Sequence, residues 1–207
     1  MKIALAQLNY HIGNFEFNTK IIIDSIRKAK TAHVDIVVFS ELAICGYPPQ
    51  DFLDYDHFVN TCIQSIHNIA IECDGIAAVV GGPCYNKNPK GKKLYNAAYF
   101  LSEKKISHII YKTLLPNYDI FDEYRYFEPN NSFQILNYKE KKIALTICED
   151  LWNVTNNPLY TTSPMDELIH QNPDFIINIS ASPFHYNQHL FRKNILNLDS
   201  DKNFHIL

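Results

Sequence analysis

Short apolar runs recur along the chain and alternate with segments of helical period. The runs are rich in β-branched residues, which favour strands. We predict strands at Ile3–Leu8, Ile36–Phe39, Ala77–Gly81, Ala97–Leu101, Ser107–Tyr111, Ile143–Ile147 and Phe175–Ile179. Between several of these runs, apolar residues recur at helical spacing, as at Ile22, Ile26 and Ala29 or at Val59, Ile63, Ile66 and Ala70. This alternation predicts an α/β fold with helices packed on a sheet.

Two of the predicted strands are too close together for a helical crossover between them. Only Ser102-Glu103-Lys104-Lys105 joins Ala97–Leu101 to Ser107–Tyr111, so these strands should form an antiparallel hairpin. The sheet is therefore expected to be mixed. After a helical stretch at about 188–200, the segment Phe204-His205-Ile206-Leu207 has the pattern of the first residues of another strand, and the chain then stops.

Size, charge and cysteine content narrow the class of protein. The 207 residues and 24.0 kDa suit one core, and no Gly/Ser-rich or Pro-rich linker and no internal repeat divides them, so we expect one domain over residues 1–207. With 19 Lys+Arg against 22 Asp+Glu, the formal net charge of -3 gives no electrostatic footprint for nucleic acid or an acidic membrane. The basic runs at Lys87–Lys93, Lys104–Lys105 and Lys139–Lys142 are expected to be solvated hairpin ends.

The five cysteines form an odd set without paired spacing. The sequence has neither a secretory signal pattern nor an apolar run long enough to span a membrane. We therefore expect a cytoplasmic protein with reduced thiols.

Three predicted strand ends carry side chains that could act together, namely Glu41, Lys112 and Cys148. In α/β sheets, residues at strand ends converge even when they are distant in sequence. A thiolate attacks a carbonyl carbon, a carboxylate moves the proton and an ammonium stabilises the oxyanion, so the trio suits amide hydrolysis through a thioester. Taken singly, Cys148 could be a buried small hydrophobe, Glu41 a loop acid or helix cap, and Lys112 a surface lysine.

The residues around these positions resemble the Glu, Lys and Cys motifs of the nitrilase, or carbon-nitrogen hydrolase, superfamily. The matching segments are Ser40-Glu41-Leu42, Gly46-Tyr47-Pro48-Pro49-Gln50-Asp51, Lys112-Thr113-Leu114-Leu115-Pro116-Asn117-Tyr118 and Cys148-Glu149-Asp150-Leu151-Trp152. The longer stretch from Leu115 to Phe127 is similar to the glutamine-hydrolysing domain of the glutamine-dependent NAD synthetase family. The resemblance runs from the first strand to about Arg192, and it implies an α-β-β-α sandwich with mixed sheets that hydrolyses the side-chain amide of L-glutamine.

The resemblance also implies a catalytic role for each of four residues. Glu41 would be the general base, Lys112 the oxyanion partner and Cys148 the nucleophile. Glu123 would be a second acid that orients the lysine.

Four further residues are expected to bind the substrate. Tyr118 and Ser182 match positions that hold glutamine in the family. Glu149 is a candidate partner for the substrate ammonium group, with a salt bridge inside the strand-to-loop turn as the alternative. Where the family commonly has glycine and then a basic residue facing the substrate carboxylate, this chain has Asn187-Gln188. Gln188 would donate only a neutral hydrogen bond, unless Arg192 or a backbone amide replaces the missing charge.

Neither histidines nor glycines indicate a metal or phosphate site. His185 and His189 are four residues apart but lack a third ligand of suitable spacing. The Gly81-Gly82-Pro83 turn resembles a strand end of the family and not a phosphate loop, because no Gly-Lys-Ser/Thr follows. We therefore expect no metal and no cofactor in this domain.

The resemblance finally implies a partner domain. In the family, ammonia passes to a C-terminal synthetase domain that uses ATP and magnesium to convert nicotinic acid adenine dinucleotide to NAD, and the Ser-Gly-Gly-x-Asp-Ser loop of that domain is absent from this sequence. We expect a hydrolase domain that lacks its C-terminal strands, with homo-oligomer contacts covering the exposed sheet edge. The alternatives are an inactive or structural fragment of this domain and a free-standing amidase that acts on another small amide.

Overall fold

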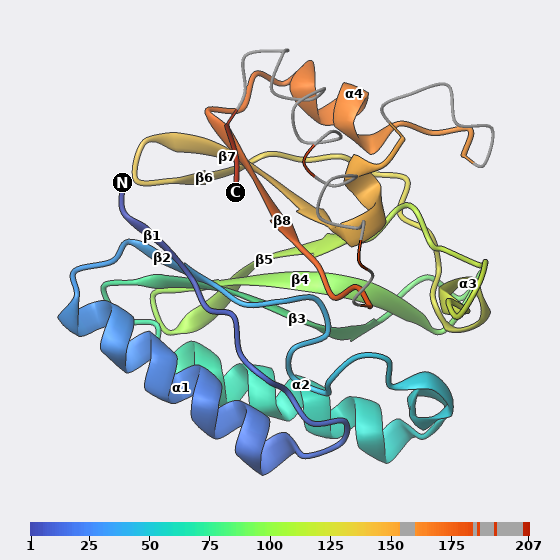
Figure 1. The fold of residues 1–207 in the computed structure, drawn as a ribbon, viewed down its shortest axis with the longest axis horizontal. Coiled ribbons are helices and arrows are strands. Elements are labelled where there is room, and N and C mark those ends of the chain that lie inside the picture. Colours follow the sequence, from blue (N-terminus) through green and yellow to red (C-terminus); the bar gives the residue numbers. More distant parts are fainter. Residues whose placement is uncertain (154–159, 184–185, 187–192, 194–204) are drawn as a thin grey trace.

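The computed structural model describes residues 1–153, 160–183, 186, 193 and 205–207, which form four layers (Figure 1). Helices α1 and α2 cover the outer face of a five-stranded sheet, and a four-stranded sheet packs against its inner face. Helix α4 lies on the far side of the second sheet. This α-β-β-α order confirms the predicted layered α/β fold.

Most of the predicted elements are present in the structure. The helices are α1 (Phe15–Thr31), α2 (Asp56–Ile71), α3 (Glu123–Tyr126) and α4 (Pro164–Ile169), with 3₁₀ turns η1 (Gln50–Asp54) and η2 (Cys148–Leu151). The strands are β1 (Ile3–Leu5), β2 (Ile36–Val38), β3 (Ala77–Tyr85), β4 (Leu94–Ser102), β5 (Lys105–Tyr111), β6 (Leu136–Tyr138), β7 (Lys141–Ile147), β8 (Phe175–Ile179) and β9 (His205–Ile206). Strand β6 was not predicted, because its sequence Leu-Asn-Tyr contains no apolar run. The helical stretch predicted at about 188–200 falls largely outside the described residues.

Both sheets are mixed, as the hairpin predicted. The first sheet has the order β1-β2-β3-β4-β5, with parallel pairing from β1 to β3 and antiparallel pairing from β3 to β5. The second has the order β6-β7-β8-β9, in which β6 is antiparallel to β7 and the other pairs are parallel. The C-terminal ends of β2, β5 and β7 thereby come to one region of the sandwich (Figure 1).

The central strands of the first sheet, β2, β3 and β4, are buried on both faces. In β3, Ala78 and Val80 pack in the cluster that includes Ile26 of α1, whereas Ala77 and Val79 pack between the two sheets. Each strand therefore needs apolar side chains on both sides, which is why the sequence shows continuous apolar runs instead of alternation.

The Gly81-Gly82-Pro83 segment is not a strand end, and that expectation was wrong. It lies within β3, which continues to Tyr85. The loop after β2 crosses the strand here, so a Cβ on Gly81 would lie 2.4 Å from Leu42 N and 2.6 Å from Ser40 O. Glycine at this position permits a close approach between backbones.

The basic runs lie where solvated hairpin ends were expected. They occupy the β3–β4 connection, the β4–β5 turn and the β6–β7 turn, where most of the side chains are exposed.

Within the described ranges, none of the helices combines the length and apolar character that crossing a membrane requires.

Gly81→Ala should destabilise the fold by moving the loop that carries Glu41. Since the new Cβ would meet backbone atoms, we expect a loss of at least about 2 kcal/mol in the free energy of unfolding, measured with urea. Gly75→Ala is the matched control, because Gly75 has a φ of +73° and nothing within 4 Å of its Cβ position. It should lose only about 1 kcal/mol, from backbone strain alone. An equal or smaller loss for Gly81→Ala would contradict the close approach.

Candidate active site

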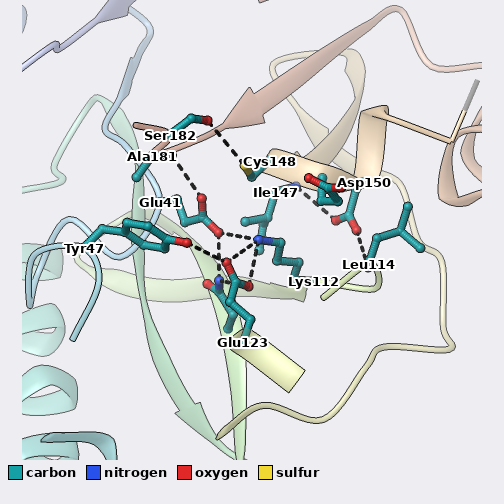
Figure 2. A network of polar contacts seen from close by, with 12 residues as sticks. Glu41, Tyr47, Lys112, Leu114, Glu123, Ile147, Cys148, Asp150, Ala181 and Ser182 are labelled. Carbon is teal, nitrogen blue, oxygen red and sulfur yellow. Dashed lines mark hydrogen bonds and ion pairs between the residues drawn. The ribbon is translucent and has the colours of Figure 1, made fainter. Parts of the chain in front are cut away.

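The three residues singled out at strand ends lie in one cluster, together with Glu123 (Figure 2). Glu41 belongs to the loop after β2, Lys112 follows β5 and Cys148 follows β7. Glu123 is the first residue of α3, and its backbone N–H donates to Pro116 O at 3.1 Å. The two sheets and one short helix thus each contribute to the cluster.

A buried ion-pair network forms the centre of the cluster. Lys112 Nζ donates to Glu41 Oε1 at 2.7 Å and to Glu123 Oε1 and Oε2 at 2.9 and 2.8 Å. The side chains of Lys112 and Glu41 are 0% exposed. All three ammonium hydrogens therefore have carboxylate acceptors, which a fully buried lysine requires.

Three further donors complete the network. Asn96 Nδ2 donates to Glu41 Oε1 at 2.9 Å and more weakly to Glu123 Oε2 at 3.4 Å. Tyr47 OH donates to Glu123 Oε1 at 3.1 Å, and the backbone N–H of Ala181 donates to Glu41 Oε2 at 3.0 Å. The sequence reasoning assigned no role to Asn96 or Tyr47. A polar amide inside the apolar strand β4 was the signal that could have identified Asn96.

The network controls the ionisation of its own members. Burial by itself would lower the pKa of the Lys112 ammonium, but Glu41 and Glu123 together raise it well above its usual value. Burial raises the pKa of Glu123, and the charge of Glu41 adds to this effect, while Lys112 opposes it. The lysine is therefore firmly charged, and Glu123 holds its charge less readily than an exposed glutamate.

Cys148 lies at a strained position beside this network. Its φ is +46°, a left-handed conformation that is unfavourable for a residue with a side chain, and it is 6% exposed. Burial raises the pKa of the thiol far above its usual value, and the charge of Glu41 raises it further, while Lys112 opposes the shift. The resting thiol is therefore protonated at neutral pH, and forming a thiolate requires a base at the site.

Asp150 links the two strand ends that carry Lys112 and Cys148. Its Oδ1 accepts the backbone N–H groups of Thr113 and Leu114, both at 2.9 Å, and its Oδ2 accepts that of Ile147 at 3.1 Å. Burial raises the pKa of Asp150 to about 7, although these three hydrogen bonds oppose the shift. A side chain that the sequence analysis left without a role thus ties the first sheet to the second.

The residues expected to bind substrate differ in their contacts near Cys148. Ser182 Oγ lies 3.9 Å from Cys148 Sγ. Glu149 is buried, and its Oε1 accepts hydrogen bonds from Tyr118 OH at 2.7 Å and Tyr160 OH at 3.0 Å. Within the described residues Glu149 makes no ion pair, so the salt bridge considered as an alternative is not found there. Gln188 lies outside the described residues.

A cavity of about 740 Å³ opens beside the network. Its lining includes Glu41, Tyr47, Glu123 and Ser182. Such a volume accommodates a small molecule.

In the part of the chain that the structure describes, no group of three or more His, Cys, Asp or Glu side chains is placed to hold a metal ion. His185 and His189 lie outside that part.

Asp150→Asn should loosen the link between the two strand ends. Asparagine offers one acceptor oxygen, so its amide N–H groups would face at least one of the three backbone donors. We expect a loss of about 1–3 kcal/mol in the free energy of unfolding, measured with urea. Asn68→Ala, a change on α2 remote from the cluster, is the control and should lose less. Equal stability of Asp150→Asn and the unmodified chain would contradict the proposed link between the two strand ends.

Comparison with known proteins identifies the family of the chain. The profile of the carbon-nitrogen hydrolase family matches residues 2–195. A glutamine-dependent NAD(+) synthetase from Synechocystis sp. is 36% identical over 211 residues, which cover 99% of this chain and 38% of that protein. The structure of glutamine-dependent NAD+ synthetase from Acinetobacter baumannii matches with a TM-score of 0.88 and 29% identity, over 99% of this chain and 37% of that one.

A more distant structure shares the fold alone. An amidase from Nesterenkonia sp. matches with a TM-score of 0.81 at 16% identity, over 100% of this chain and 74% of the amidase. The chain spans well under half the length of the synthetases that it matches. By profile, sequence and fold, the chain belongs to the carbon-nitrogen hydrolase family of enzymes, in the form that also makes up part of glutamine-dependent NAD(+) synthetases.

Proposed function

We propose that this chain hydrolyses the side-chain amide of L-glutamine through a thioester on Cys148. The observation that carries the proposal is the fully buried Lys112 held between Glu41 and Glu123 next to a strained, buried cysteine. Burying such a network is unfavourable unless every member is paired, so a role in packing alone does not account for it.

The first half of the reaction forms the thioester. Glu41 takes the proton of the Cys148 thiol as the sulfur attacks the amide carbon, because the protonated resting thiol is a poor nucleophile. The carbonyl π electrons move to the oxygen, and Lys112 stabilises the resulting oxyanion. Glu123 holds the ammonium with both oxygens, so one of these bonds can be exchanged for the oxyanion without releasing the lysine.

The second half restores the enzyme. The tetrahedral intermediate collapses, the C–N bond breaks, and Glu41 returns the proton to the leaving nitrogen, which departs as ammonia. A water molecule then attacks the thioester carbon while Glu41 accepts its proton. The C–S bond breaks, glutamate leaves, and the proton returns to the thiol of Cys148.

The residues around Cys148 are suited to binding the ammonium and carboxylate groups of glutamine. Glu149 is the candidate partner for the substrate ammonium, since Tyr118 and Tyr160 hold its carboxylate in place by their hydroxyl groups. Ser182 lies close enough to the sulfur to contact the reacting amide. Gln188 is proposed to meet the substrate carboxylate by a neutral hydrogen bond.

The ammonia would serve NAD+ synthesis. The relatives with high coverage of this chain are named glutamine-dependent NAD(+) synthetases, and this chain matches 38% of the length of one of them. We propose that a synthetase domain, with ATP and magnesium, receives the ammonia from this hydrolase domain. No cofactor is proposed for the hydrolase reaction itself.

Ammonia release from glutamine tests the proposal. The chain should release ammonia and glutamate in equal amounts, and Cys148→Ala should abolish the release because no thioester can form. Cys73→Ala is the matched control, since Cys73 is a buried thiol whose Sγ donates to Ile69 O at 3.7 Å. Equal rates of ammonia release for Cys148→Ala and the unmodified chain would contradict the proposal. Turnover of other small amides without turnover of glutamine would favour a free-standing amidase, and no turnover of any amide would favour a structural fragment.

Lys112→Met should remove activity and stability together. Without the ammonium, Glu41 and Glu123 face each other uncompensated, and we expect a loss of about 3–5 kcal/mol in the free energy of unfolding near neutral pH. Because burial raises the pKa of Glu123, the folded variant binds a proton more readily than the unfolded chain does, so the loss should shrink as the pH falls. Urea unfolding at about pH 8 and about pH 5 measures the change. A loss of stability that stays constant or grows on acidification would contradict repulsion between the buried carboxylates of Glu41 and Glu123.

A further inference from the structure

Asn96 contacts every charged member of the buried network. Its Nδ2 donates to Glu41 Oε1 at 2.9 Å and, at the longer distance of 3.4 Å, to Glu123 Oε2. Its backbone carbonyl accepts the backbone N–H of Lys112 at 2.9 Å. Among the residues that the structure describes, Lys112 and Asn96 are the two whose side chains donate to both carboxylates.

The orientation of the Asn96 amide is set by the two acids. The residue is 1% exposed, and its Oδ1 is buried without a hydrogen-bond partner among the described residues. Turning the amide over would place that oxygen against two carboxylates, so the present orientation is the favourable one. An unpartnered buried acceptor is unfavourable, and an apolar residue would avoid it. Packing of strand β4 therefore does not explain an asparagine at this position.

We infer that Asn96 is a positioning residue, which holds the Glu41 and Glu123 carboxylates at a fixed spacing around Lys112. This inference rests on the proposed glutaminase activity, in which Glu41 must be ionised and aimed at Cys148. Two like charges share one ammonium here, so a second donor between them reduces their repulsion. Among the described residues, the other titratable groups that face the two carboxylates are Tyr47 and Cys148, from the loop after β2 and from η2.

Asn96→Leu removes both N–H donors, keeps the branched shape of the side chain and leaves the backbone bond to Lys112. We expect kcat to fall about 10- to 100-fold with KM changed by less than about twofold, because the base is misplaced while the substrate contacts remain. The acid limb of the kcat/KM profile should move up by about one pH unit, because burial already raises the pKa of Glu123 and its ionised form loses a donor.

Ser102→Ala is the matched control for this change. Ser102 is a buried polar residue at the other end of β4, and it shares a hydrogen bond of 2.7 Å with Ser107. Its loss should leave the pH profile unmoved. If Asn96→Leu does not fold, Asn96→Asp keeps the shape of the side chain and should move the acid limb in the same direction, because it adds a third carboxylate.

Alkylation of Cys148 by iodoacetamide across pH, followed by mass spectrometry, separates this inference from the proposed function. The rate of this alkylation depends on the base beside the thiol and needs no glutamine. The acid limb of that rate against pH should also move to higher pH in the Asn96 variants. An inactive unmodified chain would defeat the glutaminase proposal and leave this readout in place. A fall in kcat without any shift in either pH profile, or behaviour equal to that of Ser102→Ala, would overturn the positioning role.

Discussion

The ammonium of Lys112, fully buried between two carboxylates, is the interaction on which the rest of the site depends. Removing an ammonium and two carboxylates from water is unfavourable, and only close, complete pairing offsets it. Such pairing requires that separate segments meet within hydrogen-bond distance. The loop after β2, the end of β5 and the start of α3 each supply one charge, so small errors in their packing would leave a buried charge unpaired (Figure 2).

The layered fold satisfies this requirement through backbone contacts as much as through side chains. Gly81 allows the loop that bears Glu41 to pass directly over β3. Asp150 fixes the segment after Lys112 to the residue before Cys148, so the two sheets cannot shift independently at this point. Cys148 itself is held in a left-handed conformation at the end of β7, and burial raises the pKa of its thiol. Rigid surroundings and a protonated thiol are thus two consequences of the same burial.

Apolar pattern and strand-end position were sufficient to predict much of this arrangement. The central strands β2, β3 and β4 could be predicted because both of their faces are buried, and Glu41, Lys112 and Cys148 stood out as polar or reactive residues where apolar runs end. Glu123 came from the resemblance of its motif alone, since nothing in a loop sequence shows which lysine an acid will meet. The roles of Asn96 and Asp150 were not predicted, because Thr113 and Leu114 are 37 and 36 residues away from Asp150, and Glu41 is 55 residues away from Asn96. The full length of β3 was missed because the glycines that suggest a turn serve a backbone crossing.

The central claim is that Cys148 forms a covalent bond to the substrate carbonyl. Rapid acid quenching of the chain with L-glutamine, followed by peptide mass mapping, tests it most directly, because acid preserves a thioester. A mass increase of one glutamyl group is expected on the peptide that contains Cys148, and none on the peptides that contain Cys45, Cys62, Cys73 or Cys84. Turnover of glutamine without any adduct on Cys148, or with the adduct on another cysteine, would contradict it.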